Sequence, residues 1–139
     1  MADRSFHLDI VTPERSAYSN EVTSLVVMGA DGYLGILAGH APLMTTVGVG
    51  EIRITETGGK ALLLACGGGF MQVDSERTVI LAESAERADE IIVPRALEAE
   101  ERARRRLSGD LRDCDDLDVA RAELALARAH LRLKVAGGL

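Results

Sequence analysis

Aromatic residues are scarce in this sequence, which has no tryptophan, two phenylalanines and two tyrosines among 139 residues. The core must therefore be built from Val, Ile, Leu, Met and Ala, and the length suits one small domain with an appendage. Cysteine is also rare. Cys66 and Cys114 lie in different kinds of segment and form no C-x-x-C motif, so we expect two reduced thiols.

Long apolar runs are absent as well. No run reaches the roughly 18 residues that a membrane-spanning helix needs. The first residues, MADRSFHLDIV, also lack the basic, apolar and small-residue order of a secretion signal. We therefore expect a soluble protein that is not exported.

The first part of the chain lacks a basic surface. Residues 1–87 carry 11 acidic and 6 basic side chains, whereas residues 88–139 carry 11 and 10. Nucleic-acid binding needs clustered Lys and Arg, so this balance argues against it. Glycine is frequent before residue 70 and almost absent from 88 to 136. We therefore predict two domains, 1–87 and 88–139.

The first domain shows the two-residue period of β-strands. Phe6-His7-Leu8-Asp9-Ile10-Val11 alternates apolar and polar residues, which predicts a half-buried strand with His7 pointing outward. Further strands are expected at 22–28, 33–37, 50–56, 61–65, 67–73 and 77–82, with a hairpin turn at Gly58-Gly59. Short strands at spacings of about 8 to 12 residues predict an antiparallel sandwich or barrel.

Residues 29–54, GADGYLGILAGHAPLMTTVGVGEIRI, are too rich in glycine for a long helix. Here we expect loops and short strands, with His40 and Pro42 on a stiff loop that suits contact better than catalysis. The glycines at 48–50, 59 and 67–69 lack the spacing, or the following helix, of a phosphate-binding loop. We interpret them as turns or bulges.

From about residue 88 the pattern becomes helical. Pro94 suits the first turn of a helix that runs to Leu107 and ends at Gly109. Three ion pairs at a spacing of four residues are expected on it, namely Glu98–Arg102, Glu100–Arg104 and Glu101–Arg105. A second helix is expected over 119–135, after an acidic turn at 110–118.

The second helix carries two apolar stripes. Their members are Leu117, Ala120, Leu124, Ala127, Leu131 and Val135 in the first stripe, and Val119, Ala122, Leu126, Ala129, Leu133 and Ala136 in the second. An offset of two residues rotates by about 200°, so the stripes lie on opposite sides of the helix. One stripe can pack on the first helix, and the other needs the sandwich or another protein.

Three segments resemble one known family. LGILAGHAPLMTTVGVGEIRI (34–54) closely resembles the signature of the epsilon subunit of the F-type ATP synthase. ERARRRL (101–107) and RAELALARAHLRL (121–133) look like the end of its first helix and its second helix. The resemblance implies an α+β fold, with an N-terminal antiparallel β-sandwich followed by a C-terminal antiparallel α-helical hairpin.

The resemblance also implies a function. In this family the non-catalytic subunit binds gamma and the membrane-embedded c-ring through its sandwich. Its hairpin folds back on the sandwich or extends toward the catalytic alpha and beta subunits, where it restrains ATP hydrolysis. Such a subunit of bacterial type would be peripheral, on the cytoplasmic face of the inner membrane, in a proton-translocating synthase.

Site residues follow from the same resemblance. The loops carrying Asp31, Gly32, Tyr33 and His40 would face the c-ring, with Tyr33 replacing an acidic residue of relatives and removing its salt bridge. The hairpin would contact the catalytic subunits through Arg102, Arg105, Arg106, Arg121, Arg128 and Arg132.

Nucleotide binding is a separate question. Some bacterial members bind ATP through the motif Ile/Leu-Asp-x-x-Arg-Ala. The matching stretch here is 91–96, in which Arg95 and Ala96 match but Ile92 replaces the aspartate. We therefore expect weak ATP binding or none, no other cofactor and no metal, with Arg95 left to meet a phosphate.

Two further hypotheses compete with the rotor subunit. One is a free-standing ATP-binding sandwich with a helical lid. The other is an enzyme, which we do not predict, because His7, His40 and His130 accompany no nucleophile or ligand motif.

Overall fold

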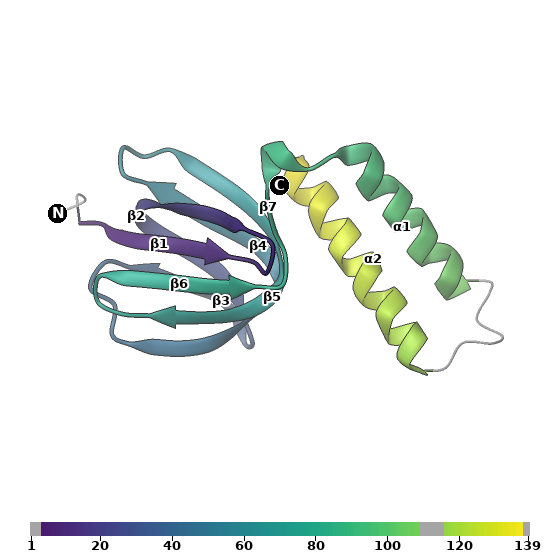
Figure 1. The fold of residues 1–139 in the computed structure, drawn as a ribbon, viewed down its shortest axis with the longest axis horizontal. Coiled ribbons are helices and arrows are strands. Elements are labelled where there is room, and N and C mark those ends of the chain that lie inside the picture. The colour runs from purple at the N-terminus through teal and green to yellow at the C-terminus, as the bar shows by residue number, and fades with distance from the viewer. Residues whose placement is uncertain (1–3, 109–115, 138–139) are drawn as a thin grey trace. The chain divides into compact units, whose positions relative to one another are not determined.

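The structure is a computed structural model that describes residues 4–108 and 116–137, with the side chains of 116–118 excepted. The chain forms two compact units, Met1–Arg87 and Ala88–Leu139. Its elements are β1 (Phe6–Val11), β2 (Ser16–Gly29), β3 (Gly32–Leu37), β4 (Leu43–Glu56), β5 (Ala61–Val73), β6 (Arg77–Ala82), β7 (Ala85–Arg87), η1 (Ala88–Glu90), α1 (Val93–Ser108) and α2 (Asp116–Ala136) (Figure 1).

Strand β1 has the alternation predicted for it. Phe6, Leu8 and Ile10 are buried, and His7 and Asp9 between them are only half-buried. Each fully buried leucine or isoleucine stabilises the fold by about 1.5–3 kcal/mol. The core of the first unit is mainly aliphatic, in keeping with the scarcity of aromatic residues.

Strand β1 also closes the sheet. It pairs antiparallel with β2 and parallel with β6, and the path continues through β5, β4 and β2 to β3 (Figure 1). The predicted antiparallel sandwich is confirmed apart from the β1–β6 pair. That pair joins strands far apart in the sequence, in which Leu8 lies opposite Thr78. A local pattern of apolar residues carries no information on its direction.

Strand β4 is longer than predicted, because glycines expected to form a turn lie inside it. The strand runs through Gly48 and Gly50. A Cβ on Gly50 would lie 2.9 Å from the Cβ of Met28 on β2. Gly50 therefore permits a close approach between two strands, and the interpretation of 48–50 as a turn is wrong.

Strand β5 joins two strands that were predicted separately, and it changes partner at its glycines. Cys66 pairs with Ala85 of β7, whereas Gly69 pairs with Ala82 of β6. A Cβ on Gly69 would collide with the carbonyl oxygen of Leu81. Strand β7 was not predicted, because three residues are too few to show a period.

The hairpin turn predicted at Gly58-Gly59 is present between β4 and β5. Both glycines have positive φ, 97° and 92°. The amide of Glu56 donates to the carbonyl oxygen of Lys60 at 2.8 Å and closes the turn. Only glycine adopts two such angles in succession without strain.

The second unit is a pair of antiparallel helices (Figure 1). Helix α1 begins one residue before Pro94, because the carbonyl oxygen of Ile92 accepts the first helical hydrogen bond from Ala96 at 3.1 Å. Helix α2 begins at Asp116, inside the predicted acidic turn. The expected helix end at Gly109, residues 110–115 and Cys114 lie outside the described residues. No helix in the described residues is long and apolar enough to cross a membrane.

Small side chains form the contact between the helices. Ala96 and Ala103 of α1 and Ala122 and Ala129 of α2 are buried. The two α2 alanines belong to the second predicted stripe, so this stripe faces α1. The opposite stripe is mixed, since Leu124 is 43% exposed and Val135 is fully buried.

Candidate functional site

The turn between β2 and β3 carries the first of the predicted contact residues. Ala30 and Asp31 connect the paired residues Gly29 and Gly32, and Gly32 has a φ of 126°. Asp31 is exposed in this two-residue turn. The turn therefore presents a carboxylate at the surface on a short, fixed backbone.

Tyr33 follows this turn and reaches across to β4. Its hydroxyl donates to Oε1 of Glu51 at 2.5 Å, and Arg53 Nη2 lies 4.0 Å from the same oxygen. Glu51 is only 4% exposed. The hydrogen bond to Glu51, with partial burial and the negative charge of that carboxylate, raises the pKa of Tyr33.

Glu51 was not predicted as part of the site. Gly50, Glu51 and Ile52 are all buried, so β4 breaks its two-residue period at this point. That break hid the role of Glu51, because a carboxylate in an alternating strand is expected to face solvent. Beside the exposed Asp31, a second carboxylate near this turn thus lies on Glu51, with Tyr33 bonded to it.

His40 lies beyond the other end of β3. Its Nδ1 donates to the carbonyl oxygen of Ala41 at 2.7 Å. A strand rises about 3.3 Å per residue, so the six residues of β3 separate the two loops by roughly 20 Å along the strand. The structure therefore does not bring Tyr33 and His40 together, and a common partner would have to contact both ends of β3.

An apolar patch lies on the outer face of β4, β5 and β6. Met44, Phe70 and Leu81 are 64%, 38% and 57% exposed, and these three residues are called the outer apolar patch. Phe70 lies opposite Leu81 on one side and opposite Thr46 on the other. The patch was not predicted. The sequence did contain a signal for it, since each of the three residues alternates with buried core residues such as Met71 and must therefore point outward.

A polar cluster surrounds His7 on the first unit. Its Nδ1 lies 2.9 Å from Glu21 Oε2, and its Nε2 lies 3.2 Å from both Ser19 Oγ and Asp9 Oδ1. Serine, histidine and glutamate at such distances resemble a nucleophile, a base and an orienting acid. However, the Asp9 carboxylate accepts hydrogen bonds from Ser19 and from Arg77, which lower the pKa of Asp9. The Ser19 proton is therefore directed to Asp9 and the serine is not activated.

Metal binding has no suitable ligand set in the part of the chain that the structure describes. There, no group of three or more His, Cys, Asp or Glu side chains is arranged to hold a metal ion.

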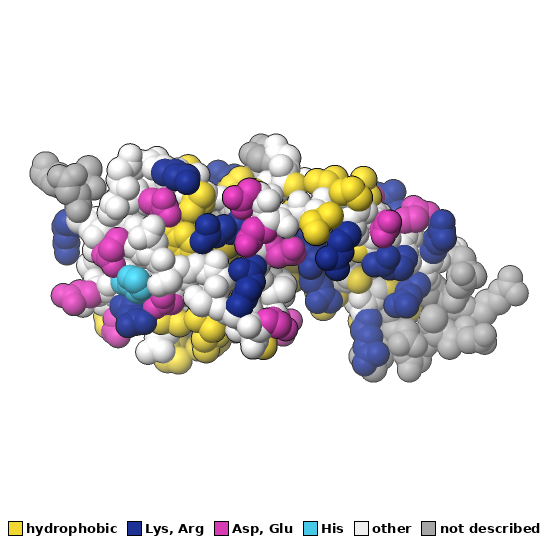
Figure 2. Space-filling model, turned by 45° about the horizontal axis from the view of Figure 1, so that its top comes forward, with side chains coloured by type: hydrophobic (Ala, Val, Ile, Leu, Met, Phe, Trp, Pro, Cys, Tyr) yellow, Lys and Arg dark blue, Asp and Glu magenta, His cyan; other side chains and the backbone are white. Residues whose placement is uncertain are grey.

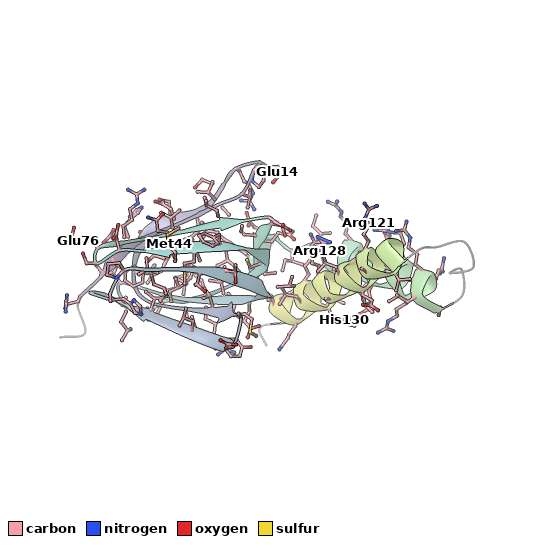
Figure 3. All side chains as sticks on the ribbon, turned by 90° about the horizontal axis from the view of Figure 1, so that it is seen from below. Glu14, Met44, Glu76, Arg121, Arg128 and His130 are labelled. Atoms are coloured by element: carbon pink, nitrogen blue, oxygen red, sulfur yellow. The ribbon has the colours of Figure 1, made fainter. Side chains whose placement is uncertain are left out.

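Three arginines share one face of α2. Residues Arg121, Arg128 and Arg132 are separated by seven and four positions, which keeps them within about 40° around the helix axis. Figure 3 shows Arg121 and Arg128 on one side of α2 and His130 on the opposite side. The structure thus brings together the α2 residues predicted for contact with the catalytic subunits.

Two arginines of α1 form ion pairs within the helix. Arg104 Nη2 lies 3.7 Å from Glu100 Oε2, and Arg105 Nε lies 3.2 Å from Glu101 Oε1. Two of the three predicted pairs are thereby confirmed. Arg105 is held at the surface by its partner.

The remaining two arginines lie toward the space between the helices. A cavity of about 120 Å³ is lined by Ala99, Arg102, Ala103, Arg106, Ala122 and Ala125. The predicted pair between Glu98 and Arg102 does not form among the described residues, and Arg102 borders this cavity. Figure 2 shows how densely Lys and Arg side chains gather on the helices.

Arg95 lies in the first turn of α1 and is exposed. Its amide donates to the carbonyl oxygen of Ile92 at 3.1 Å. The side chain of Ile92 is 54% exposed and carries no group that could accept a hydrogen bond. This end of the helix therefore offers a phosphate one cation and lacks the carboxylate of the motif.

Comparisons with known proteins cover both units. Residues 5–88 match the family model described as ATP synthase, Delta/Epsilon chain, beta-sandwich domain. Residues 89–137 match ATP synthase, Delta/Epsilon chain, long alpha-helix domain. The "ATP synthase epsilon chain" of Desulforamulus reducens is 50% identical over 129 residues, covering 93% of this chain and 95% of the relative. That of Moorella thermoacetica is 43% identical over 135 residues, covering 97% and 98%.

The fold has a counterpart among solved structures. A chain of the Euglena gracilis mitochondrial ATP synthase, in a cryo-EM structure titled OSCP/F1/c-ring, has a TM-score of 0.78 at 22% identity. The match covers 95% of this chain and 81% of that one, and it concerns the fold alone. The two sequence matches extend over nearly the full length of this chain and of each relative. The chain therefore belongs to the ATP synthase epsilon chain family, as its glycine-rich segment and its helices predicted.

Proposed function

We propose that this chain is the non-catalytic epsilon subunit of the F1 central stalk of a proton-translocating ATP synthase. It couples gamma to the c-ring through the sandwich and restrains ATP hydrolysis through the hairpin. The observation that supports this most directly is the 50% identity to an epsilon chain over 93% of the chain. The alternative, a free-standing ATP-binding sandwich, is not favoured by relatives that match over both units.

The outer apolar patch is the proposed contact for gamma. Met44, Phe70 and Leu81 are large apolar side chains that face solvent in the isolated chain. Apolar surface of this kind gains free energy when a partner removes it from water, and aromatic and methionine side chains are enriched in interfaces. Contact with gamma would bury it.

The loops at the two ends of β3 are the proposed contacts for the c-ring. Asp31 lies in an exposed two-residue turn that Gly32 closes, and His40 lies on the loop at the other end of the strand. Tyr33 contributes a hydroxyl that is already bonded to Glu51. These polar groups suit the polar loops of a membrane-embedded ring more than its apolar surface.

The arginines of the hairpin are the proposed contacts for the alpha and beta subunits. Arg121, Arg128 and Arg132 form a cationic face on α2 by their spacing, and α1 adds Arg102, Arg105 and Arg106. An acidic segment of the beta subunits would complement this charge. The contact between the helices is built from alanines, which bury few atoms each. Alanines also alternate with larger residues in the stripe of α2 that faces away from α1, so docking of that stripe on the sandwich would bury few atoms at those positions and be reversible, as a two-position switch requires.

Location follows from assembly. A subunit of the central stalk that meets the c-ring is peripheral to the membrane. In a bacterium it lies on the cytoplasmic face of the inner membrane.

Hydrolysis of ATP by the reconstituted complex tests the hairpin. The comparison is between the full chain and a chain that ends at Arg87, across a series of salt concentrations. Loss of the hairpin should raise hydrolysis at low salt. The difference should shrink as salt screens the arginines. If truncation leaves hydrolysis unchanged at every salt concentration, the hairpin is only structural and the switch is refuted.

Binding of purified gamma to the full chain tests the patch. Phe70→Glu should weaken binding at least about tenfold, because a charge would be buried in the interface. Leu37→Glu is the matched control, since Leu37 is 63% exposed on β3 outside the patch. Equal effects of both substitutions would place the gamma contact elsewhere on the sandwich.

A further inference from the structure

We propose that Glu100 locks the hairpin in its closed form by joining α1 to α2. Its Oε2 lies 2.9 Å from Nε2 of His130 on α2 and 3.7 Å from Nη2 of Arg104 on α1. The Glu100 side chain is 18% exposed, so this carboxylate lies largely between the helices. The proposal concerns the hairpin alone and does not depend on the partners of the chain.

The hydrogen positions in this cluster follow from its chemistry. An ionised carboxylate can only accept hydrogen bonds. The ring nitrogen of His130 that faces Glu100 is Nε2, so Nε2 must carry a proton. Arg104 Nη2 also lies 3.5 Å from that nitrogen, but a guanidinium cannot donate to a nitrogen that carries a proton. His130 therefore donates a hydrogen bond to Glu100, and Arg104 forms an ion pair with the same carboxylate at 3.7 Å. Arg104 holds the carboxylate in position, and His130 makes the connection to α2.

The rest of the contact between the helices makes this lock important. The buried residues of the contact, Ala96, Ala103, Ala122 and Ala129, each contribute a single methyl group. The cavity beside Arg102 leaves part of the same contact unfilled. Leu126 and Leu133, in the same stripe of α2 as Ala122 and Ala129, are only half-buried. Because the fully buried positions named above are all alanines, a hydrogen bond to a charged group adds appreciably to what holds the helices together.

The chain contains a matched control for this idea. Glu101 follows Glu100 directly, and its carboxylate pairs with Arg105 within α1. Its side chain is 58% exposed, so the pair lies at the surface. Glu100→Ala and Glu101→Ala remove the same charge and raise helix propensity by the same small amount. Each also removes an ion pair within α1, so the difference of interest is that Glu100, which is less exposed, loses a contact to α2 as well.

Amide hydrogen exchange of the full chain, followed by mass spectrometry on peptides from 93–108 and 119–137, measures opening of the hairpin. Glu100→Ala should speed exchange in both helices by about three- to tenfold. His130→Ala should also speed exchange in both helices, although His130 itself belongs to α2 and not to α1. Arg104→Ala should have a smaller effect, because the contact with His130 remains. Glu101→Ala should leave exchange in α2 unchanged.

The combined variant completes the test. If Glu100 and His130 act through each other, Glu100→Ala with His130→Ala should exchange no more than about twofold faster than Glu100→Ala alone. Independent, multiplying effects would refute the lock. So would an effect of Glu101→Ala on α2 equal to that of Glu100→Ala. Acceleration confined to the substituted helix would show local fraying, and the proposal would then be wrong.

Discussion

The hydroxyl of Tyr33 covers the carboxylate of Glu51, at 2.5 Å from an oxygen that is almost fully enclosed. Removing this donor leaves a buried carboxylate with one hydrogen bond fewer, which destabilises the folded state. Tyr33→Phe should therefore lower the urea midpoint of the sandwich. The same substitution in a Glu51→Gln background should have a smaller effect, since the acceptor is then uncharged. An equal effect in both backgrounds would mean that the hydroxyl acts elsewhere.

The two tyrosines should both ionise at unusually high pH. Burial, followed by the hydrogen bond to Glu56, raises the pKa of Tyr18, and the hydrogen bond to Glu51 raises that of Tyr33. A raised pKa means that stability is intact below the ordinary value of 10 and is lost as the pH rises through the folded value. Ultraviolet absorbance should thus show little tyrosinate at pH 10. In Glu51→Gln, one of the two tyrosines should titrate closer to the ordinary value.

Gly69→Ala should be strongly destabilising. The added Cβ would collide with the backbone oxygen of Leu81, which cannot move without breaking the pairing of β5 with β6. The expected loss is about 3 kcal/mol or more in the free energy of unfolding. Gly35→Ala is the control, because an added Cβ meets nothing within 4 Å there. It should change the free energy of unfolding by no more than about 0.5 kcal/mol in urea denaturation. Similar losses for both would contradict the close approach at Gly69.

Acid should weaken the sandwich through Asp9. Hydrogen bonds from Ser19, then from Arg77, lower the pKa of Asp9 below the ordinary value of an aspartate. The contribution of a carboxylate with a lowered pKa is present above the unfolded value and disappears as the pH falls through the folded value. Asp9→Asn should therefore reduce the urea midpoint at pH 7 and reduce its fall between pH 4 and pH 2. Asp31→Asn, at an exposed turn, should do neither.

The isolated chain should bind ATP weakly or not at all. Ile92 stands where a carboxylate is needed, and Arg95 alone remains at the start of α1. Titration calorimetry on the full chain gives the affinity. Ile92→Asp should gain binding, and adding Arg95→Ala to it should remove that gain. Micromolar binding by the unaltered chain would show that another residue supplies the missing contact.

Local patterns were sufficient for much of this fold. The two-residue period located β1 and β6 to the residue, and the change in period near residue 88 located the helices. The seven- and four-residue spacings of Arg121, Arg128 and Arg132 placed them on one face of α2. These features depend only on side chains close in sequence, so no knowledge of the tertiary structure was needed.

Contacts between distant segments could not be found in the same way. Glu51 is buried and accepts a hydrogen bond from Tyr33 of another strand, and the sequence around Glu51 does not indicate that partner. Arg102 was expected to pair with Glu98 at helical spacing, but its side chain borders a cavity that residues of α2 also line. The connection from Glu100 to His130 was missed for the same reason. In each case the partner belongs to another element.

The pairing of β1 with β6 has a consequence for biosynthesis. Strand β1 is synthesised before the other six strands, yet one of its edges is completed only when residues 77–82 follow. Among them is Arg77, which pairs with Asp9 from 68 positions away. At a synthesis rate of about 5–20 residues per second, that edge of β1 stays unpaired for roughly 3 to 14 s. Its apolar side chains, Phe6, Leu8 and Ile10, are then available to chaperones or to other nascent chains. The helices, whose contacts are closer in sequence, form without such a delay.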